Sequence, residues 1–102
     1  MHPVVQRKMS ELAELCGLYR VRRFELFGSG GGDRFDPETS DLDFLVEFQV
    51  LPAGEHADAY FGFKEALVRL FDRPVDLVMI RAIRNPYFLQ EIEPTRVLLY
   101  AA

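Results

Sequence analysis

The sequence has little cysteine, no long hydrophobic run and no signal-like N-terminus, and each absence removes a class of protein. Cys16 is the single cysteine among 102 residues, so the chain can form neither an internal disulfide nor a zinc site built from paired cysteines. Nowhere do about 18 apolar residues follow one another, and the N-terminus lacks the apolar core of a signal peptide. We therefore expect no membrane span and no secretion, and a cytoplasmic location.

Positive charge is also scarce. The formal net charge is −4, and no Lys or Arg occurs between Arg34 and Lys64. Proteins that bind nucleic acid draw most of their affinity from Lys and Arg contacts to phosphates, so we expect no direct nucleic-acid partner. The acidic residues of that interval repel one another unless a cation is present, or they form a solvated acidic loop. They are Asp36, Glu38, Asp41, Asp43, Glu47, Glu55 and Asp58.

The length and the hydrophobic content of 49% fit one domain, residues 1–102, with a single core. Hydrophobic periodicity predicts two amphipathic helices, one with Val5, Met9, Leu12, Ala13 and Cys16 on its apolar face and one spanning Phe63 to Phe71. Gly17 should end the first helix. A loop is expected over 52–58 before the second helix, which should end at Arg73-Pro74. Strands are expected over 21–27, 41–48, 75–80 and 95–100, with a further helix starting at Asn85-Pro86.

This order, helix, strand, strand, helix, strand, helix, strand, predicts an α/β (α+β) fold. We expect a mixed sheet with helices mainly on one face, leaving the other face free for a site.

Two aspartates stand on alternate positions of the second expected strand. Residues two apart in a strand point to the same face, about 6.6 Å apart along the chain, so Asp41 and Asp43 can converge on one metal cluster. Leu45 and Glu47 share their open face, and Leu42, Phe44, Val46 and Phe48 take the opposite, apolar face. An Asp-X-Asp pair alone also occurs as two solvated carboxylates.

Asp76 is the candidate for a third carboxylate, because it interrupts the apolar run 75–80. An aspartate in a buried strand is costly unless it is paired or binds a cation. It would then be a metal ligand that also accepts a proton from an attacking hydroxyl group. The alternative is an ion pair with Arg73 or Arg81.

A glycine-rich turn precedes the aspartates and contains four of the seven glycines. The missing β-carbon of Gly28 would let the backbone amides of Gly28, Ser29 and Gly30 approach phosphate oxygens, with the Ser29 hydroxyl as a further donor. The segment could instead be a flexible linker. The Gly-Lys-Ser/Thr of a P-loop is absent, and the dinucleotide-binding glycine spacing breaks at Asp33.

Gly28-Ser29 followed by Asp41 and Asp43, together with Asp76 in a later strand, resembles the minimal nucleotidyltransferases of the DNA polymerase β superfamily. The resemblance implies that Asp41, Asp43 and Asp76 form the catalytic and metal-binding triad. It also implies two Mg²⁺ ions and a nucleoside triphosphate, such as ATP, as substrate. Two such ions, about 3.5 to 4 Å apart, serve in-line phosphoryl displacement.

One position departs from the family pattern. Many members carry an arginine in the turn, where this chain has Gly32 followed by Asp33. A phosphate-binding cation is therefore missing there, although Arg34 could reach the same oxygens.

The resemblance further implies a helical HEPN-type protein partner in a toxin–antitoxin pair. The first hypothesis is an enzyme, a nucleotidyltransferase that transfers AMP to a hydroxyl group of that partner. The alternative is a catalytically weak binding module that neutralises a HEPN RNase toxin by complex formation. Nucleotidylation of a small molecule ranks last, because no acceptor domain is visible, and self-association into a homo-oligomer stays open.

Overall fold

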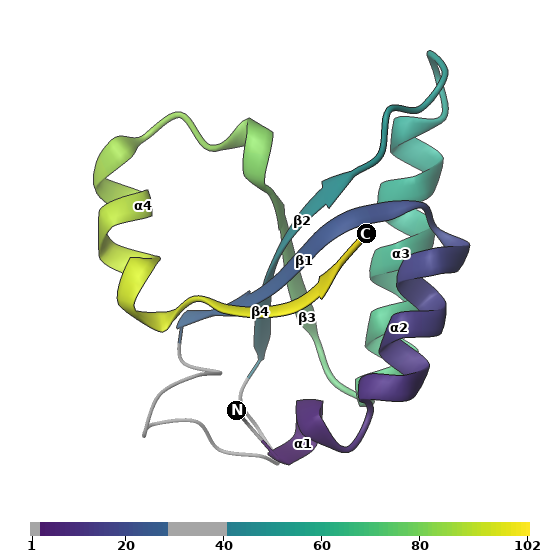
Figure 1. Ribbon diagram of the computed structural model, residues 1–102, viewed down its shortest axis with the longest axis horizontal. Helices are drawn as coiled ribbons and strands as arrows, with labels where there is room; N and C mark the ends of the chain where they lie inside the picture. The colour runs from purple at the N-terminus through teal and green to yellow at the C-terminus, as the bar shows by residue number, and fades with distance from the viewer. Residues whose placement is uncertain (1–2, 29–40) are drawn as a thin grey trace.

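The computed structural model describes residues 3–28 and 41–102 and arranges them around one four-stranded sheet (Figure 1). The helices and strands follow the expected order. They are α1 (Pro3–Gln6), α2 (Met9–Leu18), β1 (Val21–Phe27), β2 (Leu42–Phe48), α3 (His56–Phe71), β3 (Val75–Met79), the 3₁₀ turn η2 (Ile80–Ala82), α4 (Pro86–Ile92), the 3₁₀ turn η3 (Glu93–Thr95) and β4 (Val97–Ala101). No helix in the described part of the chain is both long and apolar enough to cross a bilayer.

The sheet is mixed, as the sequence predicts. Its strand order is β3-β2-β1-β4, with β1 antiparallel to both β2 and β4. β2 and β3 are parallel and are joined through α3, because parallel neighbours need a crossover connection. β3 and β4 are therefore the edge strands.

The main core lies between the sheet and the pair α2 and α3 (Figure 1). Phe24 of β1 and Phe44 of β2 stack with ring centroids 4.7 Å apart, and Phe63 of α3 meets Phe24 edge-on at 5.2 Å. All three side chains are fully buried. Aromatic groups of this size dominate the apolar area that folding removes from water, so they fix α3 against the sheet.

The opposite face is not fully open, which refines the expectation of a free face. Leu45 of β2 and Phe27 of β1 are buried there under α4, together with Ile92. The Phe27 ring meets that of Phe88 edge-on at 6.0 Å. Leu45 was expected to lie on the open side with Asp43, but α4 covers it.

The helices differ from the sequence expectation at three points. α3 begins at His56, inside the loop expected over 52–58. Gly17 lies inside α2, and the left-handed turn falls at Arg20, which has φ of 59°. The first helix is also split into α1 and α2. Asp72, with φ of 52°, ends α3 one residue before Arg73, and the Asn85 side chain accepts a hydrogen bond from the Tyr87 amide at the start of α4.

Glu25 is the one charged side chain among the described residues that is almost fully buried, at 2% exposure. Arg96 holds it with two hydrogen bonds, from Nε at 2.9 Å and from Nη2 at 2.8 Å, and Arg23 Nε donates a third at 2.9 Å. The Arg96 hydrogen bonds lower the pKa of Glu25 despite its burial. This network ties β4 to β1 at the centre of the second face.

Replacing Glu25 by Ala should destabilise the fold by about 3 kcal/mol, because removing one partner of a buried ion pair leaves the other uncompensated. Urea unfolding at pH 7 measures the change. The matched control is Glu65→Ala, which removes an exposed pair with Arg69 at 3.9 Å and should cost no more than about 0.5 kcal/mol. Equal losses in both variants would contradict a structural role for Glu25.

The pH dependence of that difference has a defined sign. Because the folded-state pKa of Glu25 lies below its ordinary value of 4.5, its contribution is present above that value and is lost as the pH falls below it. The stability gap between wild type and Glu25→Ala should therefore narrow in acid.

Candidate active site

Asp43 and Asp76 lie side by side on one face of the sheet. β2 and β3 are parallel, and their register pairs Asp43 directly with Asp76. Asp43 is half-buried, and Asp76 is exposed on the edge strand. Asp41 was expected on the same strand as Asp43, but it lies exposed just before β2 begins. Two strands distant in sequence thus bring the two carboxylates to neighbouring positions.

The three carboxylates influence one another electrostatically. Burial raises the pKa of the Asp43 carboxyl above its ordinary value of 3.8, and the negative charges of Asp76 and then Asp41 raise it further. Burial, and after it the charge of Asp76, likewise raises the pKa of Tyr60, whose hydroxyl donates a hydrogen bond to the Leu77 carbonyl. A bound cation would relieve this repulsion.

Within residues 3–28 and 41–102, no three His, Cys, Asp or Glu side chains are close enough to form a metal site by themselves. Mg²⁺, however, keeps several waters and is commonly bound by one or two carboxylates together with substrate phosphates. The Asp43 and Asp76 pair supplies oxygen ligands of that number and kind. The donor set therefore fits Mg²⁺ bound jointly with a nucleotide.

Gly28 is required by the position of Asp43. Its φ is +71°, and a β-carbon there would stand 2.9 Å from Asp43 Oδ2. The Gly28 amide donates to Thr95 Oγ1 at 2.9 Å, and the Thr95 hydroxyl donates to the Ile92 carbonyl at 2.6 Å. The open space at Gly28 thus admits the carboxylate, and Thr95 fixes the end of β1.

Sequence reasoning missed Thr95. It lies 67 residues from Gly28 along the chain, and no local spacing links the two residues. The remaining predicted phosphate contacts, Ser29, Gly30 and Arg34, lie outside the described residues and stay predictions.

The reason given for Asp76 from sequence was wrong. β3 was expected to be well buried, but it is an edge strand and Asp76 is exposed, so Asp76 needs no partner to offset burial. Arg81, one of the suggested partners, lies instead 3.6 Å from Glu47. Because the Asp76 side chain is exposed, a substrate can reach it.

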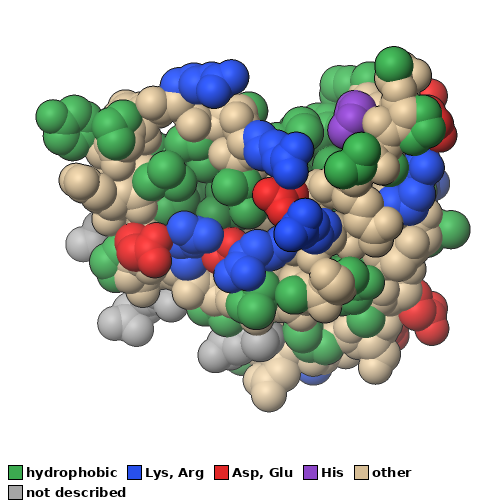
Figure 2. Space-filling view, turned by 45° about the horizontal axis from the view of Figure 1, so that its top comes forward, with side chains coloured by type: hydrophobic (Ala, Val, Ile, Leu, Met, Phe, Trp, Pro, Cys, Tyr) green, Lys and Arg blue, Asp and Glu red, His purple; other side chains and the backbone are tan. Residues whose placement is uncertain are grey.

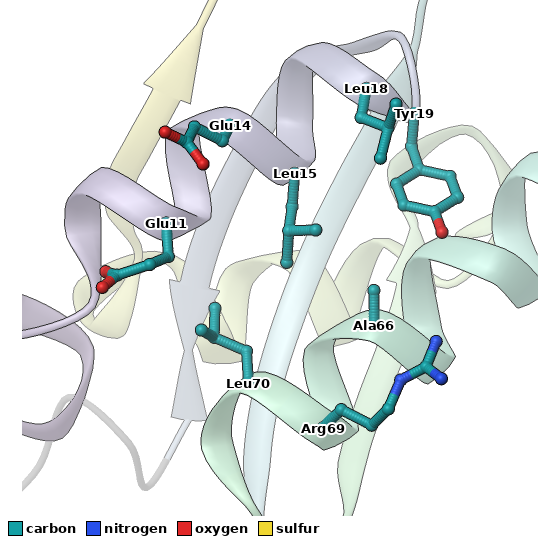
Figure 3. Close-up of a pocket in the computed structure, with 8 residues that line it drawn as sticks. All are labelled: Glu11, Glu14, Leu15, Leu18, Tyr19, Ala66, Arg69 and Leu70. Carbon is teal, nitrogen blue, oxygen red and sulfur yellow. The ribbon is translucent and has the colours of Figure 1, made fainter.

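A separate hollow of about 490 Å³ lies between α2 and α3 (Figure 3). None of the predicted site residues lines it. Its walls are formed by Glu11, Glu14, Leu15, Leu18, Tyr19, Ala66, Arg69 and Leu70. The carboxylates thus lie apart from this hollow.

The chain is similar to known proteins over most of its length. The model of the family described as "Nucleotidyltransferase domain" matches residues 9–99. The chain belongs to this family. It is a nucleotidyltransferase domain, as the Gly-Ser and Asp-X-Asp motifs predict.

Two proteins of Methanocaldococcus jannaschii are similar to this nucleotidyltransferase. "Putative protein adenylyltransferase MJ0128" is 37% identical over 75 residues, which cover 74% of this chain and 72% of the relative. "Putative protein adenylyltransferase MJ1379" is 34% identical over 76 residues, which cover 74% and 73%. Each alignment therefore spans most of this chain and most of the relative.

Solved structures confirm the predicted fold. A structure described as a "putative minimal nucleotidyltransferase" superposes with a TM-score of 0.74 at 26% identity, over 95% of both chains. A toxin–antitoxin structure with AMP-PNP gives 0.66 at 21% identity, over 92% of this chain and 73% of the other. A complex of tri-AMPylated HEPN toxin with MNT antitoxin from Shewanella oneidensis gives 0.64 at 19%, over 95% and 72%.

Gly28→Ala should both strain the backbone and displace the Asp43 carboxylate, costing about 2 kcal/mol of stability and weakening Mg²⁺ binding. The matched control is Gly54→Ala, because Gly54 has φ of +88° but nothing within 4 Å of the point where a β-carbon would stand. The control should lose only the strain, about 1 kcal/mol. Urea unfolding and calorimetric Mg²⁺ titration measure the two effects, and unchanged Mg²⁺ binding in Gly28→Ala would contradict the proposed contact.

Asp43→Asn should stabilise the metal-free protein at pH 7. The raised pKa means that the folded state disfavours the charged carboxylate, so wild type loses stability as the pH rises above the ordinary value of 3.8. The gain should be no more than about 1 kcal/mol, because the site is partly open to solvent. Thermal unfolding with a chelator measures it.

Two controls accompany that measurement. At a pH well below 3.8 the Asp43 carboxyl is protonated in both the folded and the unfolded state, so the gain should vanish. Added Mg²⁺ should stabilise wild type more than the variant, since a ligand stabilises the state that binds it. A lower melting temperature of Asp43→Asn at pH 7 without divalent ions would show that burial and neighbouring charge do not destabilise the Asp43 carboxylate.

Proposed function

We propose that this nucleotidyltransferase transfers AMP from ATP to a hydroxyl group of a HEPN-type protein partner, with Mg²⁺ bound at Asp41, Asp43 and Asp76. The observation that carries the proposal is the pairing of Asp43 with Asp76 across parallel strands. A half-buried and an exposed carboxylate at neighbouring positions offer one group to hold a cation and one that an acceptor can reach.

In the proposed reaction the acceptor oxygen forms a bond to the α-phosphorus of ATP. The bond from that phosphorus to the bridging oxygen breaks, and pyrophosphate leaves. Asp76, exposed at the edge of the sheet, accepts the proton of the acceptor hydroxyl. Bound Mg²⁺ would neutralise phosphate charge and orient the α-phosphate.

The comparisons support the choice of acceptor and partner. Both Methanocaldococcus jannaschii relatives carry names of protein adenylyltransferases. The Shewanella oneidensis complex pairs an MNT antitoxin with an AMP-modified HEPN toxin. A protein hydroxyl is therefore favoured over a small molecule.

The binding-module alternative has an observation of its own. The Gly28 amide already donates to Thr95, so it offers no free N–H to a phosphate in this arrangement. Together with Gly32 at the position where relatives place arginine, this would weaken nucleotide binding. Under this alternative, formation of the complex alone neutralises the toxin.

The test is transfer of label from ATP labelled at the α-phosphate to a purified HEPN protein encoded beside this chain, with Mg²⁺ in excess. Asp76→Asn should lower the rate by at least about 100-fold, as removal of a proton acceptor does. Asp58→Asn, an exposed aspartate on α3, is the control and should keep the wild-type rate.

The outcome also separates the two candidate functions. If wild type binds Mg²⁺ and ATP but never labels the partner, the transfer hypothesis fails. If Asp41→Asn/Asp43→Asn still neutralises the toxin as wild type does, the binding module is the correct description. Loss of neutralisation with the complex intact would favour chemistry.

A further inference from the structure

The Thr95 side chain takes the place of a backbone hydrogen-bond acceptor at the end of the ladder between β1 and β4. The antiparallel register pairs Leu26 with Val97, so two residues further along both strands Gly28 would face Thr95. β4 begins only at Val97, because Glu93–Thr95 forms the 3₁₀ turn η3. The Thr95 hydroxyl oxygen therefore accepts the hydrogen bond of the Gly28 amide, at 2.9 Å.

The orientation of the Thr95 hydroxyl group is fixed by a second hydrogen bond. Its O–H donates to the Ile92 carbonyl, three residues back in the chain, at 2.6 Å. Threonine side chains commonly bond the backbone in this way. With its proton directed to Ile92, the hydroxyl oxygen has its lone pairs available for the Gly28 N–H. Both hydrogen bonds require a hydroxyl group at position 95.

The turn that carries Thr95 is anchored at both of its ends. Ile92, just before η3, is 6% exposed and packs against side chains of β1 and β2. Arg96, just after η3, binds Glu25 of β1 and Glu93 of the turn. Figure 2 shows Lys and Arg side chains gathered around acidic ones on the face that it presents. Thr95 is thus attached to a turn that cannot shift without breaking buried contacts.

Gly28 needs an anchor because of the space that it provides. Its φ is +71°, and Asp43 Oδ2 lies where it would stand 2.9 Å from a β-carbon of residue 28. Glycine adopts positive and negative φ about equally well, so the residue that leaves room for the carboxylate hardly restrains its own conformation. The ladder between β1 and β2 ends one residue earlier, at the pair of Phe27 with Asp43. The hydrogen bond from the Gly28 amide to Thr95 supplies the restraint.

We propose that Thr95 is a positioning residue for the carboxylate pair Asp43 and Asp76. Its hydroxyl group holds Gly28 in the left-handed conformation, and Gly28 in that conformation leaves the Asp43 carboxylate room to share a cation with Asp76. This role depends on the Mg²⁺ site of the function proposed above. It gives the Gly28 amide a structural task, in place of the phosphate contact expected from the sequence.

The test compares Thr95→Val with Thr95→Ser. Valine has the shape of threonine without the hydroxyl group, whereas serine keeps the hydroxyl group without the methyl group. The measurement is calorimetric titration with ATP in saturating Mg²⁺, well below the melting temperature of every variant. The Kd of Thr95→Val should rise at least about tenfold, as when a partner behind a metal ligand is lost. Thr95→Ser should bind about as tightly as wild type.

A second readout needs neither cation nor nucleotide. The Gly28 amide proton should exchange with solvent at least about tenfold faster in Thr95→Val than in wild type or Thr95→Ser, because its acceptor is gone. Leu70→Ala is the matched control, since it removes a partly buried side chain of the main core that lines the hollow between α2 and α3. It should lower the melting temperature and leave the Kd and the exchange of Gly28 unchanged.

The sign of the change in Kd distinguishes positioning from competition. If the Thr95 hydroxyl only occupied an amide that ATP could use, Thr95→Val would free that amide and bind Mg²⁺-ATP more tightly. Tighter or unchanged binding by Thr95→Val overturns the positioning role even if AMP transfer to a HEPN protein occurs. An equal loss of affinity in Thr95→Ser or in Leu70→Ala overturns it as well.

The same measurements separate this role from the proposed function. Weaker binding by Thr95→Val, together with wild type that binds Mg²⁺-ATP but transfers no AMP, would leave the positioning role and remove the transferase function. Wild type that binds no Mg²⁺-ATP would contradict both.

Discussion

The burial of the Asp43 carboxylate beside the charge of Asp76 is the constraint on which the site depends. Parallel pairing of β2 with β3 holds both carboxylates on one face, and the burial of Asp43 keeps water from screening its charge fully. The fold overcomes this electrostatic cost elsewhere, chiefly through the aromatic core under α2 and α3. A cation bound by the pair would offset this electrostatic cost.

The second buried charge system has the opposite character. Glu25 is fully matched by Arg96 and Arg23, so its burial strengthens the connection between β1 and β4. Its network lies on the same face as the aspartates. Gly28 follows the end of β1. Its amide donates a hydrogen bond to Thr95, and its missing β-carbon leaves room for the Asp43 carboxylate. The well-paired Glu25 thus stabilises β1, the strand that pairs with β2 beside Asp43.

Sequence patterns predicted β1 at its observed bounds and β2 within one residue, because runs rich in β-branched and aromatic residues favour strands. They did not predict burial, since Phe24 to Phe27 are buried on both faces of β1. They also indicated Asp43 and Asp76 as neighbours, yet for a wrong reason in the case of Asp76, since strand order decides exposure and no local pattern encodes that order. Leu45 was assigned to the open side because the packing of α4 is a tertiary property. Thr95 and the role of Glu25 were missed for the same reason: their partners lie 67 and 71 residues away.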